Sequence, residues 1–190
     1  MDAGRFQRVE VCNDAALWVW LAEHHAQAES VWLVTWKAAH RDRYVSRQAV
    51  LDALIAHGWI DGRRMILDAD RTMQLISPRK QQAWAQSYKD RAARLEAEGR
   101  MHEAGRAALR LGQDSGLWHV SDPVDALTDP DDLVRALEAA GGLAWWQAAA
   151  RSYRRNVLRW IAQAKRPETR AKRIAISAAH AGRAEKVAQF

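Results

Sequence analysis

The sequence predicts an α+β protein: a small antiparallel sheet with a β-hairpin, covered by helices and followed by an all-helical C-terminal subdomain. Residues 31–36 pack β-branched and aromatic side chains into a run too short for a helix, which favours a core strand. Two extended runs flank the polar residues 68–70, as in a hairpin. Beyond them the apolar residues recur at helical spacing. We therefore expect an α+β body over residues 1–120 and a basic helical subdomain over residues 128–190.

The first elements of the body carry recognisable start and stop signals. Residues 6–11 alternate enough for a short strand, and Asn13 or Asp14 can accept the free amides that open the following helix. Ser46 caps a second helix. Gly58 ends that helix, because glycine readily takes the left-handed conformation that follows a helix end.

The second half of the body reads as a hairpin followed by two helices. Pro78 stops the second strand, and Gly99 and Gly112 each follow a helical pattern at the position of a C-terminal cap. The predicted strands cover residues 59–67 and 72–77, and the predicted helices cover residues 80–98 and 101–111.

The C-terminal subdomain begins after an acidic surface connection. Residues 121–132 hold five Asp, two Pro and no basic residue. Pro130 suits a first helical turn and predicts a helix that runs to Ala140. Further helices are predicted from an apolar stripe that includes Tyr153, and from Pro167 at another first turn.

Charge is distributed unevenly along the chain. The last forty residues carry eleven Lys or Arg against two Glu, a formal +9, whereas the first 150 residues sum to −3. Such a density of cations favours non-specific binding of nucleic acid or of an anionic membrane surface, although a solvated helix face is also often basic. No helix-turn-helix, RNA-recognition or zinc pattern accompanies it. The candidate basic surface comprises Arg154, Arg155, Arg159, Lys165, Arg166, Arg170, Lys172 and Arg173.

Composition narrows the class of protein further. The single cysteine cannot form an intramolecular disulfide, and no stretch approaches the ~20 apolar residues of a membrane-spanning helix. The N-terminus lacks a secretory pattern, so we expect a soluble cytoplasmic protein without a transmembrane segment. The seven histidines show no metal-ligand spacing, and phosphate-binding loops are missing. We expect no metal and no cofactor.

Short motifs along the chain occur in the order of one bacterial family. They are Leu17-Trp-Val-Trp-Leu21 with His25, Val31-Trp-Leu-Val34 with Lys37, Gly58-Trp-Ile-Asp-Gly62, Ser77-Pro-Arg-Lys80, Trp84, Gly99-Arg-Met101 with Gly105, Leu158-Arg-Trp-Ile161 and Ala164-Lys-Arg-Pro-Glu-Thr-Arg-Ala-Lys-Arg-Ile174. In these motifs the chain resembles the bacteriocin-protection or YdeI/OmpD-associated proteins.

The resemblance implies a role in protection against bacteriocins or antimicrobial peptides and in association with an outer-membrane porin. Members of the family have been predicted to be periplasmic, which disagrees with the missing signal peptide. The chain also departs from the family pattern. It has Trp84-Ala85 and Tyr88 where a Trp-Ser pair and a later Asn usually occur.

The turn at residues 58–62 supplies the main candidate site. Its glycines allow a close approach of the backbone while Asp61 presents a carboxylate, and Arg79 follows the hairpin that begins there. The candidate ligand-binding residues are Lys37, Trp59, Asp61, Arg79 and Trp84. A structural alternative is that Asp61 caps backbone amides and that Arg79 makes a buried ion pair.

Three functional hypotheses follow. The first is a non-enzymatic binding or stress-protection protein that recognises an unknown protein or small molecule through Asp61 and Arg79. The second is weak binding of nucleic acid or an anionic surface through the basic helices. The third is an enzyme that uses Asp61 as an acid or base, which we favour less. The ten tryptophans are expected to be mostly core residues.

Overall fold

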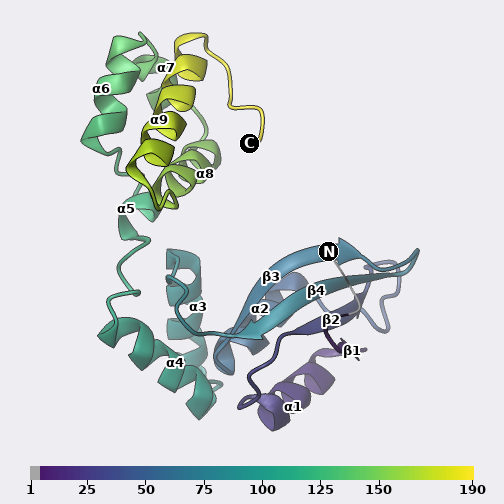
Figure 1. The fold of residues 1–190 in the computed structure, drawn as a ribbon. Coiled ribbons are helices and arrows are strands. Elements are labelled where there is room, and N and C mark those ends of the chain that lie inside the picture. The colour runs from purple at the N-terminus through teal and green to yellow at the C-terminus, as the bar shows by residue number, and fades with distance from the viewer. Residues whose placement is uncertain (1–4) are drawn as a thin grey trace. The chain divides into compact units, whose positions relative to one another are not determined.

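The computed structural model describes residues 5–190, within which nine helices and four strands form (Figure 1). The chain divides into two compact units. The N-terminal unit runs to Val120 and holds the sheet, and the C-terminal unit begins at Ser121 and is helical. The predicted α+β class is confirmed.

The sheet has four strands in the order β1-β2-β4-β3. Strand β1 pairs with β2 in parallel, whereas β2 with β4 and β3 with β4 are antiparallel, so the sheet is mixed rather than purely antiparallel. The parallel pair arises because the chain crosses through helix α1 between β1 and β2. The strands are β1 (Arg8–Glu10), β2 (Val31–Trp36), β3 (Trp59–Ile66) and β4 (Arg71–Pro78).

The hairpin of β3 and β4 is the predicted one, and its loop is closed by a carboxylate. Asp68 accepts hydrogen bonds from the backbone N–H groups of Asp70 at 2.9 Å and Arg71 at 2.7 Å. The pairing shifts between Asp61 and Arg64, which marks a bulge in β3. Asp61 therefore lies where the strand is irregular.

Local signals fix the first two helices, α1 (Asp14–His24) and α2 (Arg47–Ala56). Asn13 accepts a hydrogen bond from the N–H of Ala16 at 2.8 Å, and Ser46 accepts one from Ala49 at 3.1 Å. Gly58 has a φ of 74°, the left-handed conformation expected at a helix end.

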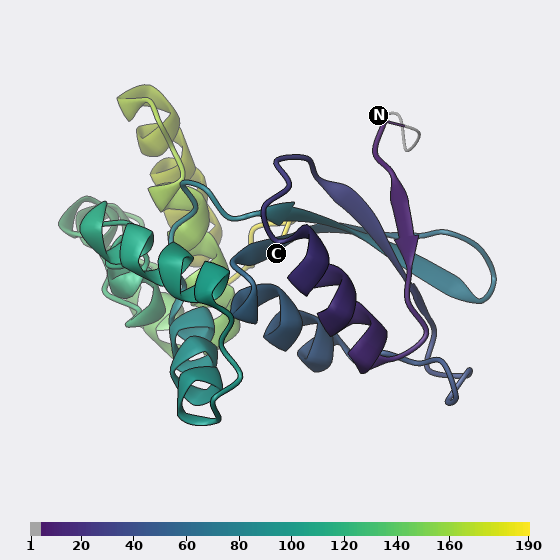
Figure 2. The ribbon, with the colours of Figure 1, turned by 90° about the horizontal axis from the view of Figure 1, so that it is seen from below.

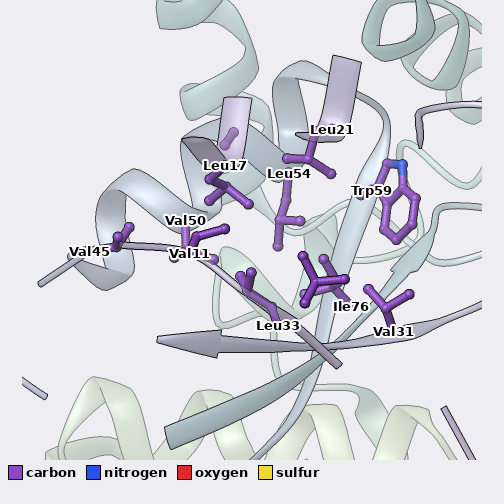
Figure 3. Packing of buried hydrophobic residues seen from close by; sticks show 12 residues of the cluster. Val11, Leu17, Leu21, Val31, Leu33, Val45, Val50, Leu54, Trp59 and Ile76 are labelled. Atoms are coloured by element: carbon purple, nitrogen blue, oxygen red, sulfur yellow. The ribbon is translucent and has the colours of Figure 1, made fainter. Parts of the chain in front are cut away.

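Helices α1 and α2 cover one face of the sheet (Figures 1 and 2). In Figure 3, Leu17 and Leu21 of α1 and Leu54 of α2 lie over Leu33 and Ile76 of the strands. All five side chains are fully buried, so this layer is the hydrophobic core of the N-terminal unit.

Two boundaries differ from the predicted ones, in helices α3 (Gln86–Ala97) and α4 (Glu103–Asp114). Helix α3 was expected from residue 80, but residues 79–85 form an extended loop in which Trp84 donates its backbone N–H to the carbonyl of Leu117 at 3.1 Å. Gly112 was expected to end α4 but lies inside it. A Cβ at Gly112 would overlap the indole of Trp84, so this glycine serves packing rather than termination.

The C-terminal unit packs its helices around one apolar core (Figure 1). Pro167 lies in the first turn of α9, as predicted, whereas Pro130 is the N-cap residue of α6 and not part of its first turn. The core includes Leu133 of α6, Trp146 of α7 and Val157 of α8, which are all fully buried. The helices are α5 (Asp122–Asp125), α6 (Asp131–Ala139), α7 (Leu143–Ala148), α8 (Arg151–Ala162) and α9 (Pro167–Gly182).

No helix among residues 5–190 is long and apolar enough to cross a membrane.

The close approach of α4 to the end of α2 gives a testable prediction. A Cβ at Gly105 would overlap the carbonyl oxygen of Ala56 and lie 2.8 Å from the Cε of Met101. Alanine favours a helix interior over glycine by about 1 kcal/mol, but the clash should outweigh this preference. We expect Gly105→Ala to lower the free energy of unfolding by about 1–3 kcal/mol, measured by urea denaturation followed by circular dichroism.

The control is Ala107→Ser, because Ala107 is exposed on the same helix. We expect it to change stability by less than about 0.5 kcal/mol. A Gly105→Ala protein more stable than the parent would contradict the contact between α4 and α2.

Candidate functional site

Arg79 lies directly after β4 and is the most unusual polar residue of the N-terminal unit. The residue is only 8% exposed. Its Nη1 donates to the backbone carbonyls of Gln82 at 3.1 Å and Ala83 at 3.3 Å. Within residues 5–190, its Nε and Nη2 atoms are buried and have no hydrogen-bond partner. Arg79 is therefore a buried cation whose hydrogen-bonding capacity is only partly used.

Two aromatic rings surround the guanidinium. The Cζ of Arg79 lies 3.9 Å from the ring centroid of Trp84 and 5.4 Å from that of Tyr88. Attraction to the ring faces offsets part of the cost of burying the charge. Burial lowers the pKa of Arg79 to about 10, against the opposing effects of Tyr88 and Asp61. The side chain therefore remains cationic at neutral pH.

Asp61 is held by neutral donors rather than by Arg79. The hydroxyl of Tyr88 donates to Oδ1 of Asp61, and Nε2 of Gln74 donates to Oδ2 at 3.1 Å. Burial, together with the hydrogen bond to Asp61, raises the pKa of the Tyr88 hydroxyl, so this group stays a proton donor. Both carboxylate oxygens are thus engaged in structural contacts.

The fold brings together three of the five candidate residues. Asp61, Arg79 and Trp84 share a neighbourhood through Tyr88. Trp59 is fully buried in the core instead, with its ring 5.7 Å from that of Trp20. Lys37 lies at the loop end of the hairpin.

The role of Lys37 follows from its contacts. Its Nζ donates to the backbone carbonyls of Asp68 at 3.0 Å and Ala69 at 2.6 Å. These contacts tie the end of β2 to the hairpin loop. Lys37 therefore stabilises the loop and is separated from Arg79 by the length of β4.

Tyr88 is the residue that sequence reasoning missed. It was noted only as a departure from the family pattern, yet it contacts both Asp61 and Arg79. Its sequence position gave no helical signal, because Trp84 lies in the loop before α3 and the two rings meet on one guanidinium only in the folded chain.

A cavity of about 330 Å³ adjoins Arg79. It lies wholly within the N-terminal unit, between the loop that follows β4 and the end of α4. This volume is at the lower end of the range of small-molecule sites. The lining residues are Arg79, Lys80, Gln81, Leu111, Ser115 and Leu117.

Three histidines that are far apart in the sequence also meet in the fold. The ring of His102 lies 4.8 Å from that of His25 and 5.1 Å from that of His57. Burial lowers the pKa of His57, whose Nδ1 bonds the carbonyl of Ala53 at 2.8 Å. In the described part of the chain, no group of three or more His, Cys, Asp or Glu has an arrangement that could hold a metal ion.

The candidate basic surface is partly neutralised by the acidic connection that precedes it. Arg154 pairs with Asp129 at 2.7 Å, and both side chains are more than four-fifths buried. Arg170 makes a two-pronged contact with Asp132 at 2.8 and 2.9 Å, which lowers the pKa of Asp132.

Weaker or different contacts hold further members of this set. Arg155 and Arg159 lie 3.7 and 4.0 Å from Asp125, and Arg173 donates to the carbonyl of Trp160. The exposed members are Arg159, Lys165, Arg166 and Lys172. The cations of α8 and α9 therefore serve partly to hold the C-terminal unit together.

Comparison with known proteins identifies two segments. Residues 9–108, more than half of the chain, match the family model described as Domain of unknown function (DUF8412). The chain belongs to this family. Residues 126–184 match a second family, Bacteriocin-protection, YdeI or OmpD-Associated, which confirms the suspected family. Of the motifs that carried the resemblance, those at residues 158–174 lie in this match, whereas those from Leu17 to Gly105 lie in the first. The turn at residues 58–62 falls within the first match. No curated protein and no solved structure matches the chain.

The contacts of Asp61 predict a structural role. In Asp61→Ala, the hydroxyl of the half-buried Tyr88 loses its acceptor, and Gln74 keeps only its 3.3 Å bond to the carbonyl of Gly62. We expect the free energy of unfolding to fall by about 1–3 kcal/mol, measured by urea denaturation. A double-mutant cycle with Tyr88→Phe should give a coupling energy of at least about 0.5 kcal/mol. Additive effects would show that the Tyr88–Asp61 contact is not formed.

Asp129 and Asp132 pair with arginines of different burial, so we expect their substitution to lower the free energy of unfolding by different amounts. Asp129→Asn leaves the buried Arg154 without its counter-ion, so we expect a loss of about 2 kcal/mol in the free energy of unfolding. Asp132→Asn is the matched control, because its pair with Arg170 is a third or more exposed. It should cost less than about 1 kcal/mol. Equal costs in thermal or urea unfolding would contradict the difference in burial.

Proposed function

We propose that this protein is a non-enzymatic binding or stress-protection protein of the YdeI/OmpD-associated type, and that it receives a small-molecule ligand in the cavity beside Arg79. The family match supports the class of protein. One observation carries the proposed site: a buried arginine with two unpartnered nitrogens lines a cavity of about 330 Å³. Buried polar groups are normally hydrogen-bonded, so the two unpartnered nitrogens of Arg79 need an explanation, and a ligand would supply one.

The contacts of Asp61 support binding rather than catalysis. A general acid or base must lie within hydrogen-bond reach of the proton that it transfers. Asp61 is absent from the lining of the cavity, and each of its oxygens already accepts one hydrogen bond, from Tyr88 or from Gln74. An enzyme that uses Asp61 remains the less favoured alternative.

Charge pairing weakens the case for nucleic-acid binding. Residues 121–190 hold twelve Lys or Arg against eight Asp or Glu, a formal +4 rather than the +9 of the last forty residues. Non-specific affinity depends on the number of phosphates that free cations neutralise. Arg154 and Arg170 already have carboxylate partners. Weak binding to an anionic surface would use the exposed residues of the candidate basic surface, which are Arg159, Lys165, Arg166 and Lys172.

The proposal predicts that filling the cavity abolishes ligand binding. Ser115→Trp places an indole at the cavity wall without altering Arg79. A library of anionic, neutral and cationic small molecules is screened by saturation-transfer NMR against the parent and this variant. We expect at least one ligand that binds the parent and is lost in Ser115→Trp.

The matched control is Gln113→Trp, because Gln113 is exposed in the last turn of α4, two residues before Ser115, and does not line the cavity. It should bind the same ligands as the parent. If the parent binds no member of the library, or if Ser115→Trp retains every ligand, the cavity is not a binding site.

A further inference from the structure

The unused part of Arg79 has a defined shape. A guanidinium presents its N–H groups in a rigid planar fork, and Nε–H lies beside the N–H of Nη2 along one edge. These are the two nitrogens without a partner in residues 5–190. Two parallel N–H groups match the two oxygens of a carboxylate or phosphate, which accept them together.

The rest of the side chain is held in place by the protein. Nη1 is fixed by the carbonyls of Gln82 and Ala83, and the ring of Trp84 lies 3.9 Å from the Cζ. These contacts restrain both the position and the plane of the guanidinium. Such preorganisation lowers the entropy that a ligand would lose in ordering the arginine.

The neighbouring carboxylate does not satisfy the fork. Asp61 is near enough to oppose the lowering of the pKa of Arg79, but its oxygens accept hydrogen bonds from Tyr88 and Gln74. A buried cation with unused donors costs free energy, which a ligand with two acceptor oxygens would recover. The site therefore favours an anion over a neutral molecule.

The other walls of the cavity indicate the remainder of the ligand. Lys80 adds a second cation, so the rim also favours negative charge, whereas the Ser115 hydroxyl already donates to the carbonyl of Leu111 at 2.7 Å. Leu111 and Leu117 form an apolar wall, and Leu111 is 53% exposed although it is a large hydrophobic residue. A short aliphatic chain would cover this wall.

We infer that the cavity binds a small oxyanion with a short aliphatic chain, either a carboxylate or a phosphate monoester, with its two oxygens on Nε and Nη2 of Arg79. Both nitrogens are covered by neighbouring atoms, so the side chains around Arg79 have to shift as the ligand enters. This inference rests on the proposed function and specifies the chemistry of the ligand.

Four probes of equal chain length test the chemistry: hexanoate, hexyl phosphate, hexan-1-ol and hexylammonium. Each is titrated into the full chain at constant ionic strength, and binding is followed by protein NMR. We expect hexanoate or hexyl phosphate to bind roughly tenfold more tightly than hexan-1-ol, and hexylammonium not to bind. The tighter of the two anions identifies the carboxylate or the phosphate as the preferred group.

Two variants test the role of the fork. Arg79→Lys keeps the charge but removes the paired donors, so we expect roughly tenfold weaker binding of the preferred anion. Lys80→Gln removes an exposed charge and should weaken binding less than about fivefold. Because Arg79→Lys removes the guanidinium that binds the carbonyls of Gln82 and Ala83, its fold is checked by near-UV circular dichroism of the tryptophans. The comparison of hexanoate with hexan-1-ol in the parent needs no variant.

The outcomes separate this inference from the proposed function. If hexan-1-ol binds the parent as tightly as both anions, the inferred preference for an oxyanion is wrong. If Ser115→Trp then no longer binds hexan-1-ol, the cavity is still a binding site. Anion binding that is unchanged in a folded Arg79→Lys protein also overturns the inference. If neither anion binds the parent, the inference fails, and the library screen then decides whether the cavity takes another class of ligand.

Discussion

The contact between Trp84 and Gly112 is the constraint on which the candidate site depends. The indole lies where a Cβ would otherwise project from α4, so the loop that follows β4 can pack closely against that helix. Trp84 is 1% exposed and therefore rigidly placed. Its ring forms the surface on which Arg79 rests. A larger residue at position 112 would move the ring and with it the guanidinium.

The burial of Arg79 follows from this arrangement and from what the loop offers. A buried charge is unfavourable unless it is paired or hydrogen-bonded. Here the loop supplies two carbonyls and the ring of Trp84, and α3 supplies the ring of Tyr88. No carboxylate pairs with Arg79, because Asp61 accepts from Tyr88 and Gln74. The fold thus keeps Asp61 and Arg79 close together, but only Asp61 has a hydrogen-bond partner for every charged atom. That imbalance distinguishes the site from a structural ion pair.

Features set by neighbouring residues were predictable from the sequence, and features set by distant ones were not. The caps at Asn13 and Ser46 and the run of β2 depend on local chemistry. The start of α3 depends on a bond from Trp84 to Leu117, and the role of Gly112 depends on an indole 28 positions earlier in the chain. Proximity of Asp61 and Arg79 was foreseeable from the hairpin. The absence of an ion pair between them was not foreseeable, because Asp61 accepts instead from Tyr88 of helix α3.

The same distinction applies to charge in the C-terminal unit. A count along the sequence separates an acidic connection from a basic tail, whereas folding places Asp129 against Arg154 and Asp132 against Arg170. Charges paired at this distance cancel each other's field beyond about a Debye length, roughly 8 Å at physiological salt. A partner approaching α8 and α9 therefore meets the exposed Lys165, Arg166 and Lys172 more than the paired arginines. The net charge of a segment consequently overstates its attraction for phosphates when its counter-ions belong to the same folded unit.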